Sequence, residues 1–124
     1  MRRSQRLLIV EDDPNLRRLY KEEFGEEGYE VLVAETGEGA LEVARSNPID
    51  GAVLDIRLGG MDGITLMRHL LVARPNLPVV VNTSYTTFKS DFSTWAADRY
   101  VVKSSDLGEL KAAVHDAIQG RKAA

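Results

Sequence analysis

The sequence contains no cysteine. This absence excludes disulfide bonds, thiolate nucleophiles and thiolate zinc sites, and it is compatible with a reducing cytoplasm, where we expect the protein. Long apolar runs are also absent. The basic start over residues 1–6 is followed by an apolar run of residues 7–10 only. Such a run is too short for a signal peptide or a membrane span, so we expect no membrane contact.

The chain also lacks an excess of positive charge. Its formal net charge is -3 and its pI is about 5.4, whereas nucleic-acid binding depends on clustered Lys and Arg. We therefore expect no direct contact with nucleic acid. With 124 residues, 44% of them hydrophobic, the chain is large enough for one compact domain with its own core. We expect a single domain over residues 1–124, with residues 1–5 and 121–124 as flexible tails.

Short apolar runs alternate with segments of helical periodicity along the whole chain. The runs predict five buried strands at residues 7–10, 31–34, 52–54, 79–81 and 100–102. Apolar residues at helical spacing lie between and after them, at Leu16, Leu19, Tyr20 and Phe24, at Ala40, Leu41 and Ala44, at Ile64, Met67, Leu70 and Leu71, and at Leu110, Ala113, Val114 and Ala117. The last of these helices is predicted to end near Gly120.

Alternation of strands and helices predicts an α/β fold with parallel strands joined by right-handed crossovers. We expect a five-stranded doubly wound sheet in the flavodoxin-like order 2-1-3-4-5, with helices on both faces. Asp13-Pro14 predicts the start of the first helix, and Asn47-Pro48 predicts the end of the second. Residues 85–95 are rich in Ser, Thr and aromatic residues, so the fourth helix should be short or irregular.

Polar residues follow the predicted strands at the edge where ligands bind in such a sheet. Glu11 and Asp12 follow the first strand, Asp55 the third, Thr83 the fourth and Lys103 the fifth. Three carboxylates brought together repel one another unless a cation compensates for their charge. Mg²⁺ prefers hard oxygen ligands and is often bound by carboxylates and a phosphate together, so these three acids indicate Mg²⁺ as the cofactor.

A carboxylate in this setting can attack a phosphoryl group and form an acyl phosphate. Asp55 is our candidate for the attacking group, with Lys103 neutralising charge on the transferring oxygens and Thr83 donating a hydrogen bond to the phosphate. The backbone carbonyl of Arg57, two residues past Asp55, is our candidate for a further ligand of the metal.

Five segments, spread over nearly the whole chain, form a specific combination in their order and spacing. They are residues 8–13 (LIVEDD), 54–58 (LDIRL), 60–63 (GMDG), 78–84 (PVVVNTS) and 98–103 (DRYVVK). This combination resembles the receiver domain of bacterial response regulators, the phosphoacceptor module of two-component signalling systems.

The resemblance implies a role for each matching residue. Glu11 and Asp12 form the acidic pocket with Asp55 as phosphoacceptor, the Arg57 carbonyl completes the metal site, Lys103 contacts the phosphate, and Thr83 and Tyr100 form a switch pair. It also implies a histidine kinase or phosphotransfer protein as donor and a protein or effector domain downstream. Such a domain is not an enzyme in the usual sense, although it assists its own phosphorylation and dephosphorylation. The resemblance is also compatible with a homodimer that forms on phosphorylation.

The sequence departs from the family pattern at several positions. Ser104 stands where Pro usually follows the lysine, Gly59 replaces a frequent Pro, and Asn82 places an amide in an apolar strand. These departures leave two other functions open, a receiver-like interaction module that is not phosphorylated and a small phosphohydrolase that uses an aspartyl phosphate. Tyr100 has a plainer interpretation as an aromatic residue that packs against the last helix.

Overall fold

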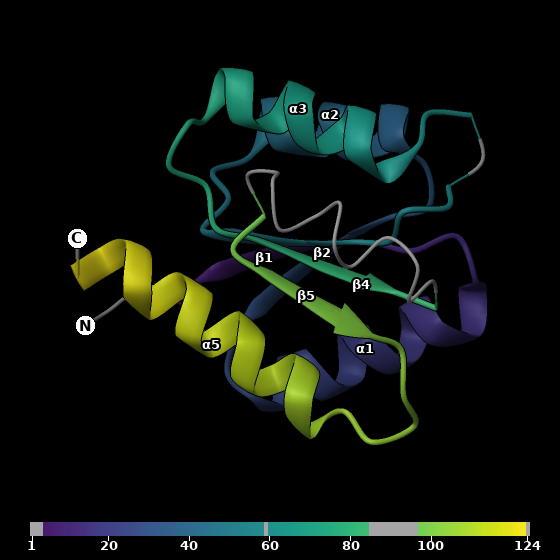
Figure 1. The fold of residues 1–124 in the computed structure, drawn as a ribbon, viewed down its shortest axis with the longest axis vertical. Helices are drawn as coiled ribbons and strands as arrows, with labels where there is room; N and C mark the ends of the chain where they lie inside the picture. The colour runs from purple at the N-terminus through teal and green to yellow at the C-terminus, as the bar shows by residue number, and fades with distance from the viewer. Residues whose placement is uncertain (1–3, 59, 85–96, 124) are drawn as a thin grey trace.

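The computed structural model describes residues 4–58, 60–84 and 97–123 as alternating strands and helices (Figure 1). The strands are β1 (Arg6–Val10), β2 (Glu30–Ala34), β3 (Gly51–Leu54), β4 (Val79–Thr83) and β5 (Arg99–Val102). The helices are α1 (Pro14–Glu26), α2 (Gly37–Ser46), α3 (Gly63–Ala73) and α5 (Gly108–Ala123). Every predicted strand and these four predicted helices are confirmed. The fourth helix predicted over residues 85–95 lies outside the described residues, as does Gly59.

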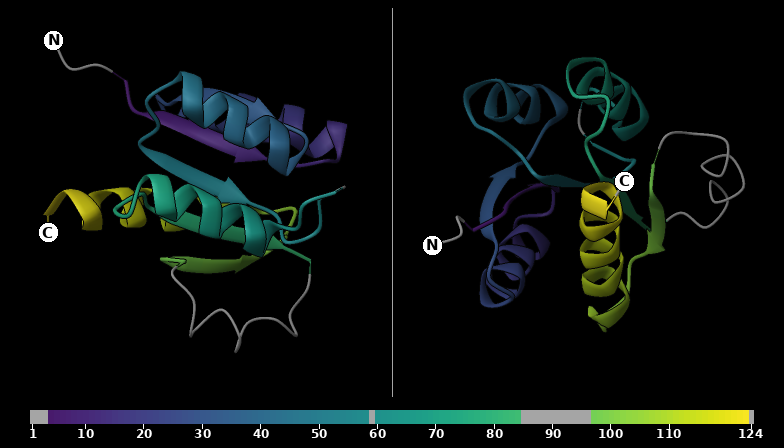
Figure 2. Two further views of the ribbon diagram at one scale, coloured as in Figure 1. Left: turned by 90° about the horizontal axis from the view of Figure 1, so that it is seen from above. Right: turned by 90° about the vertical axis from the view of Figure 1, so that its left-hand side faces the viewer.

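The strands form one parallel sheet in the order β2-β1-β3-β4-β5, which confirms the predicted topology. Helices α2 and α3 cover one face of the sheet, and α1 and α5 cover the other (Figures 1 and 2). All strands point the same way, so their ends meet at one edge, which we call the carboxyl edge. The opposite edge, where the strands begin, is called the amino edge below.

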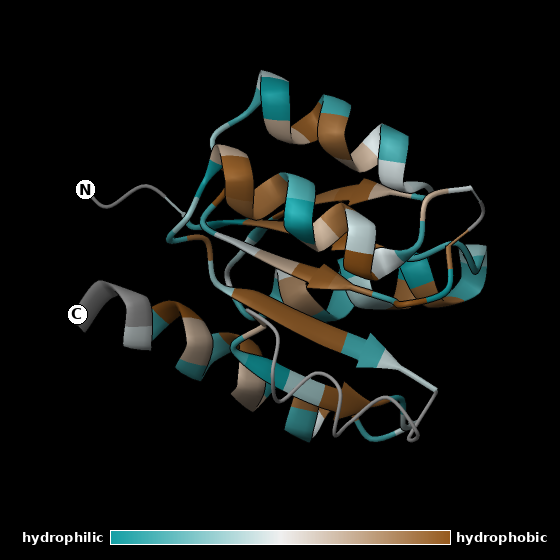
Figure 3. Ribbon diagram, turned by 45° about the horizontal axis from the view of Figure 1, so that its top comes forward, coloured by the Kyte–Doolittle hydropathy of each residue, from teal (hydrophilic) through white to brown (hydrophobic). Residues whose placement is uncertain are grey.

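Side chains alternate between the two faces of each strand, and this alternation divides the core into two layers. On β1, Leu8 and Val10 belong to the layer under α2 and α3, whereas Leu7 and Ile9 belong to the layer under α1 and α5. The inner strands β1, β3 and β4 are buried on both faces and are therefore apolar for most of their length, whereas the edge strands β2 and β5 are partly exposed. The helices carry both polar and apolar residues (Figure 3).

Local signals in the sequence set the helix boundaries. The Asp13 carboxylate accepts hydrogen bonds from the backbone N–H groups of Asn15 and Leu16, and Pro14 takes the first helical position of α1. Gly28, with φ of +101°, lies in the left-handed region just after this helix. Helix α2 ends before Asn47-Pro48, as predicted.

Two details differ from the sequence pattern. Leu19 is 38% exposed, because the buried stripe of α1 is centred on Tyr20 and Phe24, and Leu19 lies at its margin. Helix α5 continues past Gly120 to Ala123, since the residues that follow the glycine are good helix formers. No helix in the described part of the chain, α5 included, has the length and apolar character to cross a membrane.

Gly63, the first residue of α3, lies directly against the segment that follows β3. Its backbone N–H donates a 2.7 Å hydrogen bond to the carbonyl of Ile56, and a Cβ atom at this position would overlap the backbone carbonyl oxygen of Asp55. Because the neighbouring atoms belong to the backbone, no side chain can rotate away to make room. Glycine is therefore the residue that this approach of α3 to Asp55 requires.

We predict that Gly63→Ala lowers the free energy of unfolding by about 1–3 kcal/mol, the usual cost of overpacking, because the backbone must shift. Gly25→Ala is the matched control, since nothing lies within 4 Å of a Cβ atom there and the position is helical. Alanine should stabilise α1 by up to about 1 kcal/mol. Urea unfolding measures both variants, and a Gly63→Ala protein as stable as the wild type would contradict the packing described.

Candidate functional site

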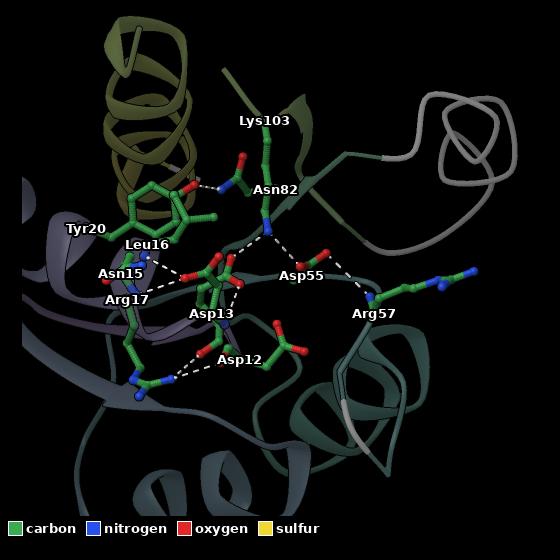
Figure 4. Close-up of polar contacts among 11 residues, drawn as sticks. Asp12, Asp13, Asn15, Leu16, Arg17, Tyr20, Asp55, Arg57, Asn82 and Lys103 are labelled. Atoms are coloured by element: carbon green, nitrogen blue, oxygen red, sulfur yellow. Dashed lines mark hydrogen bonds and ion pairs between the residues drawn. The ribbon is translucent and has the colours of Figure 1, made fainter. Parts of the chain in front are cut away.

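Three acids and the lysine that were predicted to converge do so at the carboxyl edge, and Figure 4 labels Asp12, Asp55 and Lys103 among them. Glu11 and Asp12 follow β1, Asp55 follows β3, and Lys103 follows β5, while Thr83 is the last residue of β4. One carboxylate oxygen from each of Glu11, Asp12 and Asp55 lies within 4.8 Å of the others. The fold thus brings together three acids that are separated by up to 44 positions in the sequence.

Lys103 bridges the two buried carboxylates of this cluster. Its Nζ atom lies 2.7 Å from Glu11 Oε1 and 2.8 Å from Asp55 Oδ2. Burial alone would lower the pKa of Lys103, but the hydrogen bonds to Asp55 and Glu11 outweigh burial and raise the pKa above its usual value. Lys103 is therefore charged at neutral pH and serves as the counterion of both acids.

Glu11 is the most deeply buried acid of the site, with only 2% of the residue exposed. Burial raises its pKa, and the hydrogen bonds from Lys103 and from the backbone N–H of Asp13, at 3.1 Å, oppose that rise. Both of its carboxylate oxygens are thus engaged by protein donors. Arg17 Nη1 donates to the Glu11 carbonyl at 2.9 Å and fixes the backbone of the same residue.

Asp12 differs from Glu11 because its side chain is exposed to solvent. Together with Glu11 and Asp55 it offers a set of oxygen ligands, one from each carboxylate. Hard oxygen donors that are partly open to water fit a Mg²⁺ ion, which keeps several water ligands. The donor set therefore fits the predicted cofactor.

The backbone of Arg57 is hydrogen-bonded to the side chain of Asp55. The Arg57 N–H donates to Asp55 Oδ1 at 3.4 Å, and the Arg57 side chain is exposed. The ligand role of its carbonyl stays a prediction. A turn of this kind after β3 holds the Asp55 carboxylate at the edge of the sheet.

Thr83 and Tyr100, the predicted switch pair, lie on neighbouring strands. Thr83 is fully buried, and its carbonyl accepts a 2.8 Å hydrogen bond from the backbone N–H of Lys103. Tyr100 is partly buried, which raises its pKa, and it packs against the core layer under α2 and α3. The plainer interpretation, in which Tyr100 packs against the last helix, is therefore wrong, because alternation directs its side chain to the other face of the sheet from α5.

Sequence reasoning missed a buried polar contact beside the site. Asn82 Nδ2 donates a 3.1 Å hydrogen bond to the hydroxyl of Tyr20, and both residues are buried. Burial raises the pKa of Tyr20. The amide of Asn82 within an apolar strand indicates that a hydrogen-bond partner is needed. The sequence pattern alone does not indicate which residue of α1 provides it.

We predict that Tyr20→Phe lowers the free energy of unfolding by about 1–3 kcal/mol, because it leaves the Asn82 amide buried without this partner. Asn82→Val in the same protein should recover part of that loss, since the unpaired amide is then gone. A double-mutant cycle measured by urea unfolding gives the coupling free energy. Strictly additive effects would show that the hydrogen bond does not contribute to stability.

Comparisons with known proteins point to one family. A profile of the response regulator receiver domain matches residues 7–115. The chain is 30% identical over 113 residues to sporulation initiation phosphotransferase F of Bacillus subtilis, covering 90% of this chain and 91% of that protein. It is 33% identical over 116 residues to the regulatory protein AtoC of Escherichia coli, covering 92% of this chain but only 25% of AtoC.

Solved structures agree with the sequence comparison. The response regulator TrrA of Thermotoga maritima, in complex with Mg²⁺ and BeF, superimposes with a TM-score of 0.86 at 42% identity, covering 91% of this chain and 98% of TrrA. TrrA in complex with the histidine kinase ThkA superimposes with a TM-score of 0.83 at 42% identity, covering 91% of this chain and 97% of TrrA.

Proposed function

This chain belongs to the response regulator receiver domain family of two-component systems, and on that premise we propose that Asp55 accepts a phosphoryl group from the phosphohistidine of a histidine kinase or phosphotransfer protein. The observation that carries the proposal is the Asp55 carboxylate itself. It follows a buried strand and lies beside two other acids, and Lys103 Nζ lies 2.8 Å from its Oδ2 atom. Burying an ionised carboxylate costs free energy, and ionisable groups in such surroundings are typical of functional sites.

In the proposed reaction, a carboxylate oxygen of Asp55 attacks phosphorus in line while the bond from phosphorus to the donor imidazole breaks. Lys103 is already charged and lies beside the reacting carboxylate, so its ammonium group stabilises negative charge on the transferring oxygens. Glu11 keeps Lys103 in place through the second ion pair. The same groups assist hydrolysis of the acyl phosphate by water.

Mg²⁺ is the cofactor in this proposal, held by Glu11, Asp12, Asp55 and the Arg57 carbonyl. The ion supplies charge neutralisation at the phosphoryl oxygens when bound. Asp12 is the most accessible of the three acids, because its side chain is exposed, whereas both Glu11 oxygens accept hydrogen bonds from Lys103 and Asp13. Asp12 therefore gains most from the ion and should dominate its affinity.

Readout of phosphorylation is proposed to pass through Thr83 and Tyr100. The backbone hydrogen bond from Lys103 to Thr83 joins the ends of β5 and β4 next to the reacting group. A hydroxyl bond from Thr83 to the phosphoryl group would draw these strand ends toward Asp55, and Tyr100 on β5 would follow. The changed surface would engage a downstream protein, an effector domain or a second copy of the chain.

We predict that Asp55→Asn abolishes acid-labile labelling by radioactive acetyl phosphate, because an amide cannot form the acyl phosphate. Asp62→Asn is the matched control, since Asp62 is an exposed cap of α3 and asparagine caps equally well. It should label like the wild type. Equal labelling of the Asp55→Asn protein would reject Asp55 as the acceptor.

We further predict that millimolar Mg²⁺ raises the melting temperature, because the ion binds the folded chain in preference to the unfolded one. At a Mg²⁺ concentration of about 100 times Kd, binding adds about 2.7 kcal/mol to the free energy of unfolding. Asp12→Asn should remove most of this shift, whereas Asp13→Asn, which preserves the α1 cap, should keep it. An unchanged melting temperature for the wild type would favour an interaction module without metal or phosphate.

A further inference from the structure

A cavity of about 370 Å³ lies at the amino edge of the sheet, away from Asp55. Its lining comes from segments that precede β1, β3 and β4 and from the second half of α5, on the left-hand side of Figure 1. Strand β3 has 4 residues and rises by about 3.3 Å per residue, so it separates this edge from the carboxyl edge by roughly 13 Å. The cavity is therefore distinct from the cluster around Asp55, and its volume is within the range of small-molecule sites.

The walls of the cavity combine an apolar floor with a few polar groups. The apolar part comes from Ile49, Pro75, Leu77, Pro78 and Ile118, and the polar part from Gln5, Asp50, Arg74 and Asn76. A largely apolar lining with a small number of convergent polar groups is typical of sites for small organic ligands.

Arg74 is the cation of this lining, and its charge has no anionic partner among the described residues. Its Nη2 atom donates to two neutral carbonyl oxygens at the end of α2, those of Ala44 at 2.7 Å and Asn47 at 2.9 Å. Its Nη1 atom is buried and makes no hydrogen bond within the described part of the chain. The helix end offsets part of the charge, but only with the partial charges of carbonyl groups.

Gln5 and Asp50, which line the same cavity, also bear on the ligand that it would accept. Gln5 Nε2 is also buried and has no hydrogen-bond partner among the described residues. The Asp50 carboxylate is engaged elsewhere, since its Oδ2 atom accepts the backbone N–H of Arg6 at 2.7 Å. Buried N–H donors without acceptors cost free energy, so an acceptor that carries negative charge would be stabilised here.

We propose that this cavity binds a small organic monocarboxylate with a compact apolar body. The carboxylate would accept hydrogen bonds from Arg74 Nη1 and Gln5 Nε2 after small side-chain rotations, and the apolar body would cover Leu77, Pro78 and Ile118. A doubly charged inorganic phosphate fits less well, because one guanidinium group offsets only one of its two charges, Asp50 repels a dianion more strongly than a monoanion, and the apolar floor offers no donors. This site is independent of phosphorylation at Asp55.

Benzoate is the probe for the test, added to the full chain while backbone ¹H–¹⁵N spectra are recorded. We expect saturable shifts at the amides of Asn76, Leu77 and Ile118, with the amides around Asp55 unaffected. Benzyl alcohol, which has the same ring without the charge, should bind at least about tenfold more weakly, and inorganic phosphate should produce no shifts at these amides.

Variants assign the binding to the two donors. Arg74→Met keeps the aliphatic stem and should weaken benzoate binding by roughly tenfold or more, and Gln5→Leu by about threefold. Arg45→Met is the matched control, because Arg45 pairs with Glu42 on α2 and does not line this cavity, so the affinity should not change. Asp55→Asn should bind benzoate like the wild type, which separates this proposal from the phosphoacceptor role.

Circular dichroism checks that each variant is folded. If Arg74→Met does not fold because the end of α2 loses its donor, Gln5→Leu and the comparison of benzoate with benzyl alcohol decide the matter. Equal binding of benzyl alcohol, shifts outside the cavity, or benzoate affinity unchanged by the substitutions at Arg74 and Gln5 would each overturn the proposal.

Discussion

The double ion pair of Lys103 is the interaction on which the carboxyl edge depends. Parallel strands end at the same edge about 4.8 Å apart, so acids that follow adjacent strands are forced together by the fold itself. Glu11 follows β1 and Asp55 follows the neighbouring β3, and both are buried. Two buried carboxylates without a counterion would cost several kcal/mol each, and the Lys103 ammonium from β5 offsets that cost at 2.7 and 2.8 Å. Under the proposed function, the same ammonium would also meet the phosphoryl group.

Features that depend on neighbouring residues in the chain were predictable from the sequence. Asp13-Pro14 starts α1 and Asn47 ends α2 because capping and proline geometry are local. The alternation of apolar runs and helical segments fixed the topology, since parallel pairing and right-handed crossovers leave few alternatives. Convergence of Glu11, Asp12, Asp55 and Lys103 followed from topology alone, because each stands at the end of a strand.

Features that depend on contacts between distant segments were not predictable in this way. The partner of Asn82 is Tyr20, on a helix that lies 62 positions earlier, and periodicity places several α1 residues on the same face. The guanidinium of Arg74 reaches across to the end of α2, a contact that no spacing rule indicates. Leu19 shows the same limit, because the margin of a buried stripe is set by the surface against which it packs.

The contact of Gly63 with the Asp55 peptide has a mechanical consequence. Side chains such as those of Lys103 and Glu11 can rotate to absorb a small displacement, but two peptide groups in direct contact cannot. The first turn of α3 and the backbone of Asp55 are therefore joined by direct backbone contact at Gly63. A displacement of the backbone at the end of β3 would therefore reach the start of α3 without a side-chain rotation to absorb it.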